Sequence, residues 1–344
     1  MTQASDDPTP TVAADQALPL TMRAALRHRY GGPDQVVIET VPRPEPGAGE
    51  VLVRVRAAGL DRATLHLLTG LPYLARLALG VRRPSRAILG QQVAGEVVAV
   101  GAGDVPFAVG ARVFGTAASG SFAEYAVASP KRLAPTPAGV SDVDAATIGV
   151  SGVTGREAVL RGGQLQAGQR VLVLGASGAV GSFAVQVASG LGAEVTGVCS
   201  DAKLEFVRTL GAQHVADYRS TSLADLGGGF DLIVDIGGNR RVSQLRAALT
   251  PTGRLVIVGG EEGGPALGGI QRNFFASMAD WFTSRQLGWL FAEGTTAGCA
   301  KVADLIAQGT VRPAIDRQVG LDGVVAAIEA MQRGELRGQA VVVP

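Results

Sequence analysis

The stretch that decides the fold is Arg170-Val-Leu-Val-Leu-Gly-Ala-Ser-Gly-Ala-Val-Gly181. Its start is a nearly continuous apolar run, which is typical of a strand buried on both faces of a parallel sheet. The glycines that follow lead into a helix-length stretch from Val180 to Leu191. In such a turn, Gly178 would let backbone approach a pyrophosphate, and Gly181 would let the helix pack close to the strand.

A dinucleotide is the ligand that this turn predicts. A helix that begins after such a strand presents unpaired N–H groups and positive potential to phosphates. A tight structural turn is the alternative, but the strand before, the helix after and a second strand at Glu194–Cys199 favour the nucleotide. The residues expected to hold it are Ala176 (at the first glycine position), Ser177, Gly178, Ala179, Val180 and Gly181.

The end of the second strand favours NADPH over NADH. An NAD-binding chain usually has a carboxylate about 20 residues after the glycines, where it binds the ribose 2′-OH. Ser200 stands there instead and leaves room for a 2′-phosphate, which Lys203 would neutralise and Tyr218 would contact. Asp201 follows Ser200 directly, and it would be the ribose ligand of an NADH-binding chain if the position of that ligand is shifted by one residue. The plainer alternatives are a solvated Lys203 and a Tyr218 that anchors a loop.

Outward from this motif, the chain divides by pattern. Residues 145–293 alternate apolar strands with helices, which predicts a doubly wound parallel sheet of the α/β class. Residues 22–144 contain short strands broken by Gly and Pro, which predict a small barrel or sandwich. Residues 294–344 resemble that first part, so a nucleotide-binding domain is expected to be inserted into a β-rich one. Residues 1–21 are expected to form a flexible tail.

Composition excludes several classes of protein. The 344 residues are 47% hydrophobic and 18% charged, which excludes a disordered chain. With 31 Lys and Arg against 30 Asp and Glu, the net charge of +1 predicts neither a nucleic-acid partner nor a membrane partner. No apolar stretch is long enough to span a bilayer. Two cysteines and no secretory signal predict a cytoplasmic location.

Several segments in order resemble the medium-chain dehydrogenase/reductase superfamily, and within it the zinc-free quinone oxidoreductase branch. They are Tyr30-Gly-Gly-Pro, Gly90-Gln-Gln-Val-Ala-Gly, Gly120-Ser-Phe-Ala-Glu-Tyr, Val150-Ser-Gly-Val-Thr-Gly and Gly253-Arg-Leu-Val-Ile-Val-Gly-Gly. The resemblance implies a GroES-like barrel domain beside the Rossmann domain, and a homodimer joined through a late strand near residues 285–291. It also implies cofactor contacts at Thr154, Gly237, Val258, Gly259, Asn273 and Phe274.

The departures from zinc-dependent relatives predict that no metal is bound. Those relatives have a Cys ligand where this chain has Leu60, and a His-Glu pair where it has Gln91-Gln92. Its three scattered histidines are not a substitute, because a catalytic zinc needs three protein donors. Gln339 also replaces the Lys that the family usually has after Gly338.

The expected reaction centre is the loop after the second strand, where zinc-free relatives usually carry an Asn and an Asp. Here Asp61 and Thr64 stand at those positions, and His66 stands where quinone reductases often have Tyr. We expect hydride transfer from NADPH to a small-molecule quinone or α,β-unsaturated carbonyl. His66 or the Thr64 hydroxyl would stabilise charge on the carbonyl oxygen, and His66 or water would supply the proton.

Each of these residues also has a structural interpretation. Asp61 is well suited to cap a helix, and His66 would serve equally as a polar core residue. Tyr73 would either bond a substrate carbonyl or pack at the rim of the cleft. Two alternative functions therefore stay open: a pathway-specific ene- or carbonyl-reductase, and a non-enzymatic protein whose binding is gated by the cofactor.

Overall fold

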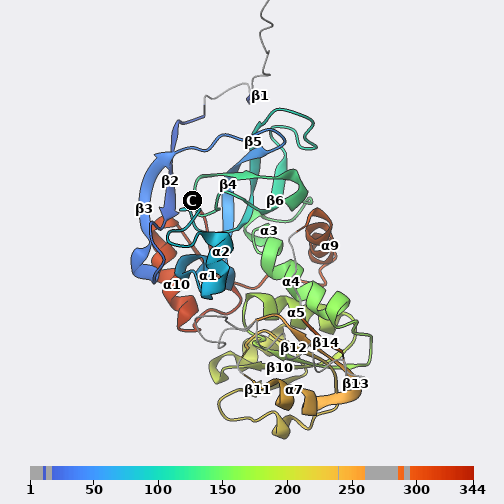
Figure 1. The fold of residues 1–344 in the computed structure, drawn as a ribbon. Helices are drawn as coiled ribbons and strands as arrows, with labels where there is room; N and C mark the ends of the chain where they lie inside the picture. Colours follow the sequence, from blue (N-terminus) through green and yellow to red (C-terminus); the bar gives the residue numbers. More distant parts are fainter. Residues whose placement is uncertain (1–10, 13–17, 239, 260–285, 290–294) are drawn as a thin grey trace, which may run out of the picture.

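The chain folds into a β-rich unit and a unit of parallel strands and helices. The structure is a computed structural model, and it describes residues 11–12, 18–238, 240–259, 286–289 and 295–344. Figure 1 shows the β-rich unit above the other, with the end of the chain returning to it. Near the end of the chain, residues 340–342 pair with residues 58–60, so this C-terminal segment joins the same sheet as the earlier strands.

The β-rich unit is built around one eight-stranded sheet and a separate strand pair, β2–β3. The order along the sheet is β15-β16-β4-β5-β6-β8, with β1 on β5 and β7 on β4. The strands are β1 (Thr11–Val12), β2 (Thr21–Leu26), β3 (Val37–Pro42), β4 (Val51–Leu60), β5 (Gln92–Val100), β6 (Arg112–Thr116), β7 (Tyr125–Ala128), β8 (Leu133–Pro135), β15 (Ile315–Val319) and β16 (Gln339–Val342).

Four short helices among the described residues belong to this unit. They are α1 (Arg62–Thr69), α2 (Arg76–Leu79), α3 (Asp142–Ala145) and α10 (Val324–Gln332). The 3-10 turns are η1 (Pro33–Gln35), η2 (Tyr73–Ala75), η3 (Pro130–Arg132), η6 (Asp201–Lys203), η7 (Ala224–Leu226) and η8 (Leu321–Gly323). Two π-helical turns, η4 (Ile148–Gly152) and η5 (Ala158–Gly162), flank α4 (Val153–Glu157).

The second unit is a parallel six-stranded sheet in the order β11-β10-β9-β12-β13-β14. Its strands are β9 (Arg170–Leu174), β10 (Glu194–Cys199), β11 (His214–Asp217), β12 (Phe230–Asp235), β13 (Leu249–Ile257) and β14 (Gln286–Trp289). Its helices are α5 (Ala179–Gly190), α6 (Leu204–Thr209) and α7 (Val242–Ala248), whereas α9 (Thr296–Ala307) packs on β8 and β6 of the β-rich unit and on η4 and α4. Strand order reverses between β9 and β12, and ligands of open α/β sheets bind at the carboxyl ends of such neighbours.

Burial explains why the decisive stretch becomes the centre of this sheet. Val171, Leu172 and Val173 of β9 are fully buried, because β10 and β12 pair with the strand on either side and helices cover it. After β10 the chain continues through η6 directly into the short α6. No helix among the described residues is long and apolar enough to cross a membrane.

Candidate active site

The turn between β9 and α5 has the geometry of a phosphate cradle. Gly175 has φ of +85°, a conformation that glycine adopts without strain. Gly178 is the N-cap of α5, and no side chain caps the helix there. A Cβ at Gly178 would meet only the Gly175 carbonyl oxygen, at 3.5 Å, so the space before the helix is open. The uncapped N–H groups of α5 therefore face room for an anion.

Gly181 sets how closely α5 approaches β9. A Cβ at this position would overlap the Gly175 carbonyl oxygen and the backbone of Ala176. Both roles that the sequence assigned to the two glycines thus have a steric basis. Ala176 and Ser177 are buried, whereas Gly178, Ala179 and Val180 are partly exposed at the helix start.

The C-terminal segment closes one side of this cradle. Gly338 forms an isolated parallel bridge with Gly178, and its N–H donates to the Ser177 carbonyl oxygen at 2.8 Å. The Lys203 ammonium is buried and donates to the carbonyl oxygens of Gly334 at 2.6 Å and Leu336 at 2.5 Å. Lys203 is thus not the solvated residue of the alternative interpretation, and burial lowers the pKa of its ammonium. Its contact with a 2′-phosphate stays a prediction.

Two arginines that the sequence reading missed lie near the carboxyl ends of β10 and β11. Tyr218 is half exposed, and its backbone N–H donates to the Cys199 carbonyl oxygen at 3.1 Å, next to Ser200. The Arg219 guanidinium lies 5.3 Å from the Tyr218 ring centre, and Arg240 donates to the Tyr218 carbonyl oxygen at 3.1 Å. Positive charge thus gathers where a 2′-phosphate is expected.

Asp61 has the capping geometry that its alternative interpretation described. One carboxylate oxygen, Oδ1, accepts from the Thr64 N–H at 3.0 Å and from the Thr64 hydroxyl at 3.2 Å, at the start of α1. Both side chains are buried. Burial raises the pKa of the Asp61 carboxyl above its ordinary value, although these hydrogen bonds oppose the rise. The Thr64 hydrogen is thereby directed to Asp61 and away from any substrate.

Gln92 is the residue that joins the reaction centre to the nucleotide-binding unit. Its Nε2 donates to Asp61 Oδ2 at 3.0 Å and to Ser151 Oγ at 3.4 Å. Its Oε1 accepts from the N–H groups of Val150 at 2.9 Å and Ser151 at 3.2 Å, in η4. The sequence showed Gln92 only as a lost zinc ligand. No pattern in the sequence pointed to this role, because Gln92 and Asp61 are 31 positions apart and are brought together only when β4 pairs with β5.

Gln339 brings a second buried amide to the same place. It lies one residue after Gly338 and opposite Asp61 if the register of β16 on β4 is continued. A Cβ at Gly59 would lie 2.6 Å from Gln339 Nε2 and 2.9 Å from Gln92 Nε2, so the two amides share the space that this glycine leaves. Both polar atoms of Gln339 lack a partner among the described residues. An orphaned buried amide of this kind marks a place that favours a polar group.

His66 and Tyr73 lie nearer the surface. His66 is exposed on α1, and its Nδ1 lies 2.9 Å from the Leu71 carbonyl oxygen. Because a carbonyl only accepts, Nδ1 carries the hydrogen and Nε2 is left to exchange a proton. The core-residue interpretation of His66 is therefore wrong. The Tyr73 ring is exposed, and the Arg76 guanidinium lies 4.7 Å from its centre.

The remaining predicted cofactor residues lie along the carboxyl ends of β12 and β13 or on α4. Gly237 N–H donates to the Leu174 carbonyl oxygen at 3.2 Å, and Val258 N–H donates to the Asp235 carbonyl oxygen at 2.9 Å. A Cβ at Gly259 would overlap the backbone of Ile236. Thr154 is nearly buried on α4, which packs on α5. Asn273 and Phe274 lie outside the described residues.

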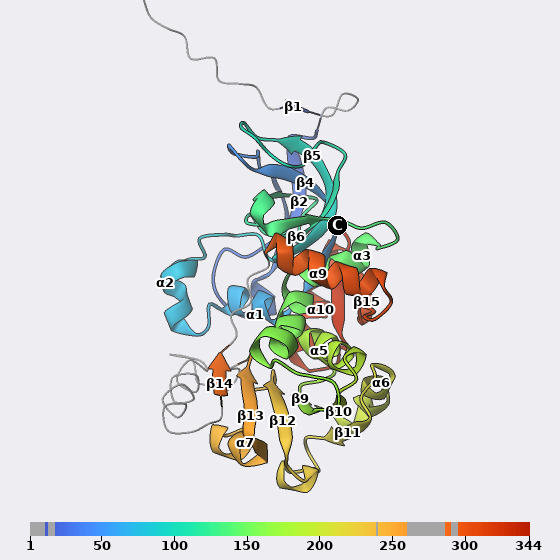
Figure 2. The ribbon, with the colours of Figure 1, turned by 90° about the vertical axis from the view of Figure 1, so that its right-hand side faces the viewer.

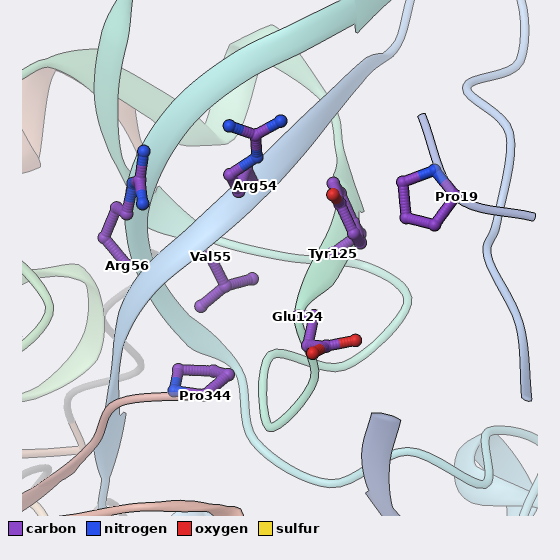
Figure 3. A pocket seen from close by; sticks show the side chains of 7 residues that line it. All are labelled: Pro19, Arg54, Val55, Arg56, Glu124, Tyr125 and Pro344. Carbon is purple, nitrogen blue, oxygen red and sulfur yellow. The ribbon is translucent and has the colours of Figure 1, made fainter. Parts of the chain in front are cut away.

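A separate hollow of about 220 Å³ lies on the β-rich unit (Figure 3). It is lined by Pro19, Arg54, Val55, Arg56, Glu124, Tyr125 and Pro344. Arg56 pairs with Glu96 at 3.3 Å, Glu124 accepts from the Arg23 N–H at 2.8 Å, and the Arg54 guanidinium lies 5.9 Å from the Tyr125 ring centre. None of the predicted site residues lines it. Within the described residues, no three His, Cys, Asp or Glu side chains form a metal-binding group.

Comparison with known proteins identifies the family. Residues 47–138 match the family described as alcohol dehydrogenase GroES-like domain, and residues 210–342 match the family described as zinc-binding dehydrogenase. The trans-enoyl reductase pgmF of Aspergillus terreus is 31% identical over 86% of this chain and 86% of its own length. The mitochondrial NAD(P)H oxidoreductase RTN4IP1 of Drosophila melanogaster is 29% identical over 99% of this chain and 90% of its own.

Structural comparison agrees with this assignment. The quinone oxidoreductase from Coxiella burnetii superposes with a TM-score of 0.83 at 25% identity, over 94% of this chain and 99% of that one. Fold and site together define an oxidoreductase with a nicotinamide cofactor. The chain belongs to the quinone oxidoreductase-like branch of the medium-chain dehydrogenase/reductase superfamily.

The two glycines of the cradle are expected to respond oppositely to alanine. Gly181→Ala should destabilise the fold by about 1–3 kcal/mol, because the added methyl overpacks the α5–β9 contact. Gly178→Ala should leave thermal unfolding nearly unchanged yet weaken nucleotide binding at least tenfold, because its methyl occupies the phosphate approach. Thermal unfolding and NADPH titration of both variants test this. Equal nucleotide affinity in Gly178→Ala and the native chain would contradict the cradle.

Gln92→Leu is expected to lower stability by about 3 kcal/mol, since it leaves the Val150 and Ser151 N–H groups and the Asp61 carboxylate short of partners. Turnover should fall with it. Gln91→Leu, at the half-buried neighbouring position, is the matched control and should change stability by less than about 1 kcal/mol. Urea unfolding of both variants measures the difference. Equal effects at the two positions would show that Gln92 has no special part in joining the units.

Proposed function

We propose that this protein is an NADPH-dependent, zinc-independent reductase of quinones or α,β-unsaturated carbonyl compounds. The observation that carries the proposal is the open, uncapped cradle at Gly178. Gly178 is bridged to Gly338, and the strand that follows Gly338, β16, pairs with β4 next to the buried Asp61 and Gln92. The printed names of the relatives include quinone oxidoreductases and a trans-enoyl reductase. Those names support an enzyme over a non-enzymatic binding protein.

The preference for NADPH rests on the residues around the end of β10. Ser200 provides no carboxylate for the ribose, and Arg219 and Arg240 contact Tyr218 close to this strand end, where they would meet a 2′-phosphate. Arginine suits this role because its planar fork of donors matches phosphate oxygens. Asp201 remains the ribose ligand under the rival assignment to NADH.

The bound cofactor would supply the hydride, and the chain's own side chains would manage the charge and the proton. His66 Nε2 would bond the substrate oxygen or pass a proton to it, since Nδ1 is fixed on the Leu71 carbonyl oxygen. Tyr73 would offer a second donor near the base of the same loop. Asp61 and Gln92 would hold α1, and with it His66, against η4. Gln339 would offer its unpaired amide to a polar group of the nucleotide.

The side chains at the ligand positions support the proposed zinc independence. Leu60 and the Gln91–Gln92 pair provide no thiolate, imidazole or carboxylate. Both cysteines are buried and free, and burial raises the pKa of Cys199 to about 11, so neither is an activated nucleophile. A cytoplasmic location is part of this proposal, as is a homodimer through the edge strand β14.

A pathway-specific ene-reductase is the second candidate. It is favoured by the identity of 31% to the trans-enoyl reductase pgmF. It uses the same cradle and the same donors, and differs in the substrate that reaches them. A panel of acceptors separates it from a quinone reductase.

The test follows loss of NADPH and NADH absorbance with a quinone, an enone and an aldehyde, each with and without a chelator. We expect chelator-resistant turnover with faster use of NADPH. Arg219→Gln should raise the KM for NADPH about tenfold, the size of one lost charge-assisted contact, and leave that for NADH unchanged. Lys301→Gln, at an exposed site on α9, is the control. Chelator-sensitive turnover would overturn zinc independence, and faster NADH use would move the ribose contact to Asp201.

The buried Asp61 predicts how stability changes with pH. Its pKa in the folded chain is raised, so its contribution to stability is greatest below the ordinary carboxyl range and is lost as pH rises through the folded pKa. Asp61→Asn removes this titration. The melting temperature of the native chain minus that of Asp61→Asn should therefore fall from about pH 4 to about pH 8. A difference that is constant across this range would contradict the raised pKa.

A further inference from the structure

An unusual concentration of exposed apolar side chains lies beside the candidate site, on the segment formed by residues 73–87, here called the arginine lobe. Eight large hydrophobic side chains are exposed among those described, and four of them fall within nine residues. They are Tyr73 (52% exposed), Leu74 (44%), Leu77 (75%) and Val81 (63%). Single exposed apolar residues are ordinary, but a contiguous group of them marks an interaction surface.

The same lobe carries positive charge without any counter-charge in its sequence. Residues 62–95 contain five arginines and no aspartate or glutamate, in a chain whose net charge is only +1. Arg82, Arg83 and Arg86 are exposed, and none has an ion-pair partner among the described residues. The prediction of no nucleic-acid or membrane partner rested on the net charge of the whole chain. That sum does not show the local excess of positive charge in residues 62–95.

The lobe is anchored to residues outside it by hydrogen bonds and a cation–π contact. The Tyr30 hydroxyl donates to the carbonyl oxygens of Leu79 at 2.8 Å and Gly80 at 2.7 Å. Arg76 donates to the Gly70 carbonyl oxygen at 3.0 Å, and its guanidinium lies 4.4 Å from the Tyr30 ring centre. Figure 2 shows α2 projecting from the side of the molecule. The exposed apolar side chains are therefore presented on an anchored frame.

We propose that the arginine lobe docks on the surface of a lipid bilayer that contains anionic headgroups. Apolar side chains beside several arginines are the composition that binds at a bilayer interface, because the former enter the acyl boundary and the latter attract anionic lipid. Charge complementarity favours this occupant over a neutral surface, and the exposed Leu77 and Val81 favour it over a purely charged protein partner. The docked lobe lies in the interface and does not span the bilayer.

Docking would bring the reaction centre to the place where an apolar substrate is dissolved. The lobe follows α1 directly, and its base is joined to His66 by the bond to the Leu71 carbonyl oxygen. Quinones with long apolar chains partition into bilayers, so a docked cleft would receive them without transfer through water. This delivery rests on the proposed function, whereas the docking itself does not.

Vesicle flotation of the full chain tests the docking. We expect binding to mixed phosphatidylcholine and phosphatidylglycerol vesicles, no binding to phosphatidylcholine alone, and weakening by salt. Arg82→Gln, Arg83→Gln and Arg86→Gln combined should reduce partitioning about a hundredfold. Leu77→Ser with Val81→Ser should reduce it on the anionic vesicles too. Lys131→Gln, Arg132→Gln and Lys301→Gln combined remove three exposed cations from η3 and α9, and should leave binding almost unchanged.

Turnover separates a failure of docking from a failure of the proposed function. With a water-soluble quinone, the lobe variants should keep native rates. With a quinone dissolved in anionic vesicles, they should lose most of their rate. Absence of native binding to anionic vesicles, or equal binding by the lobe variants, overturns the proposal and leaves an acidic protein as the occupant to examine. Vesicle binding without turnover of any quinone or enone would uphold docking and overturn the proposed reaction.

Discussion

The close contact between α5 and β9 at Gly181 is the constraint on which the rest of the site depends. Because no side chain fits there, the helix can approach the strand until backbone meets backbone. That approach places the uncapped N-terminus of α5 at the switch point of the sheet. The bridge from Gly178 to Gly338 then brings β16, and with it the β-rich unit, against the same turn. Nucleotide cradle and reaction centre are thus parts of one arrangement.

The reaction centre is held together by amides where zinc-dependent relatives would have charged ligands. Gln92 uses all its hydrogen-bonding capacity on Asp61, Ser151 and the backbone of η4, so it fixes one unit against the other without adding charge. Asp61 is then a buried carboxyl with neutral partners. That setting is why its pKa is raised, since desolvation outweighs the hydrogen bonds it accepts. The Gln339 side chain lies near the Gln92 amide, and its own amide has no hydrogen-bond partner among the described residues.

The arginine lobe extends this architecture outward. The hydrogen bond from Tyr30 anchors it to the β-rich unit, and that from Arg76 to Gly70 anchors it to the end of α1, while residues 62–95 contain five arginines and no acidic residue. A protein that is neutral as a whole can still present a cationic and apolar face, because binding depends on local potential within a Debye length and not on the total charge. The site and the proposed docking surface therefore share one short helix as their common support.

The sequence by itself determined the fold class, the strand–turn–helix unit and the family. The first two follow from local patterns, namely an apolar strand and closely spaced glycines from Arg170 to Gly181 and the helix that follows, and the family follows from several segments in order along the chain. Only the tertiary structure decided which polar groups meet around Asp61 and Gln92. Gln92 lies 31 positions from Asp61 and 59 positions from Ser151, and the Gln339 amide beside Gly59 comes from the far end of the chain. Lys203 likewise turned inward to carbonyl oxygens 131 and 133 positions away. Side-chain periodicity records which face of an element is buried, but it holds no information about which distant backbone a polar group will meet there.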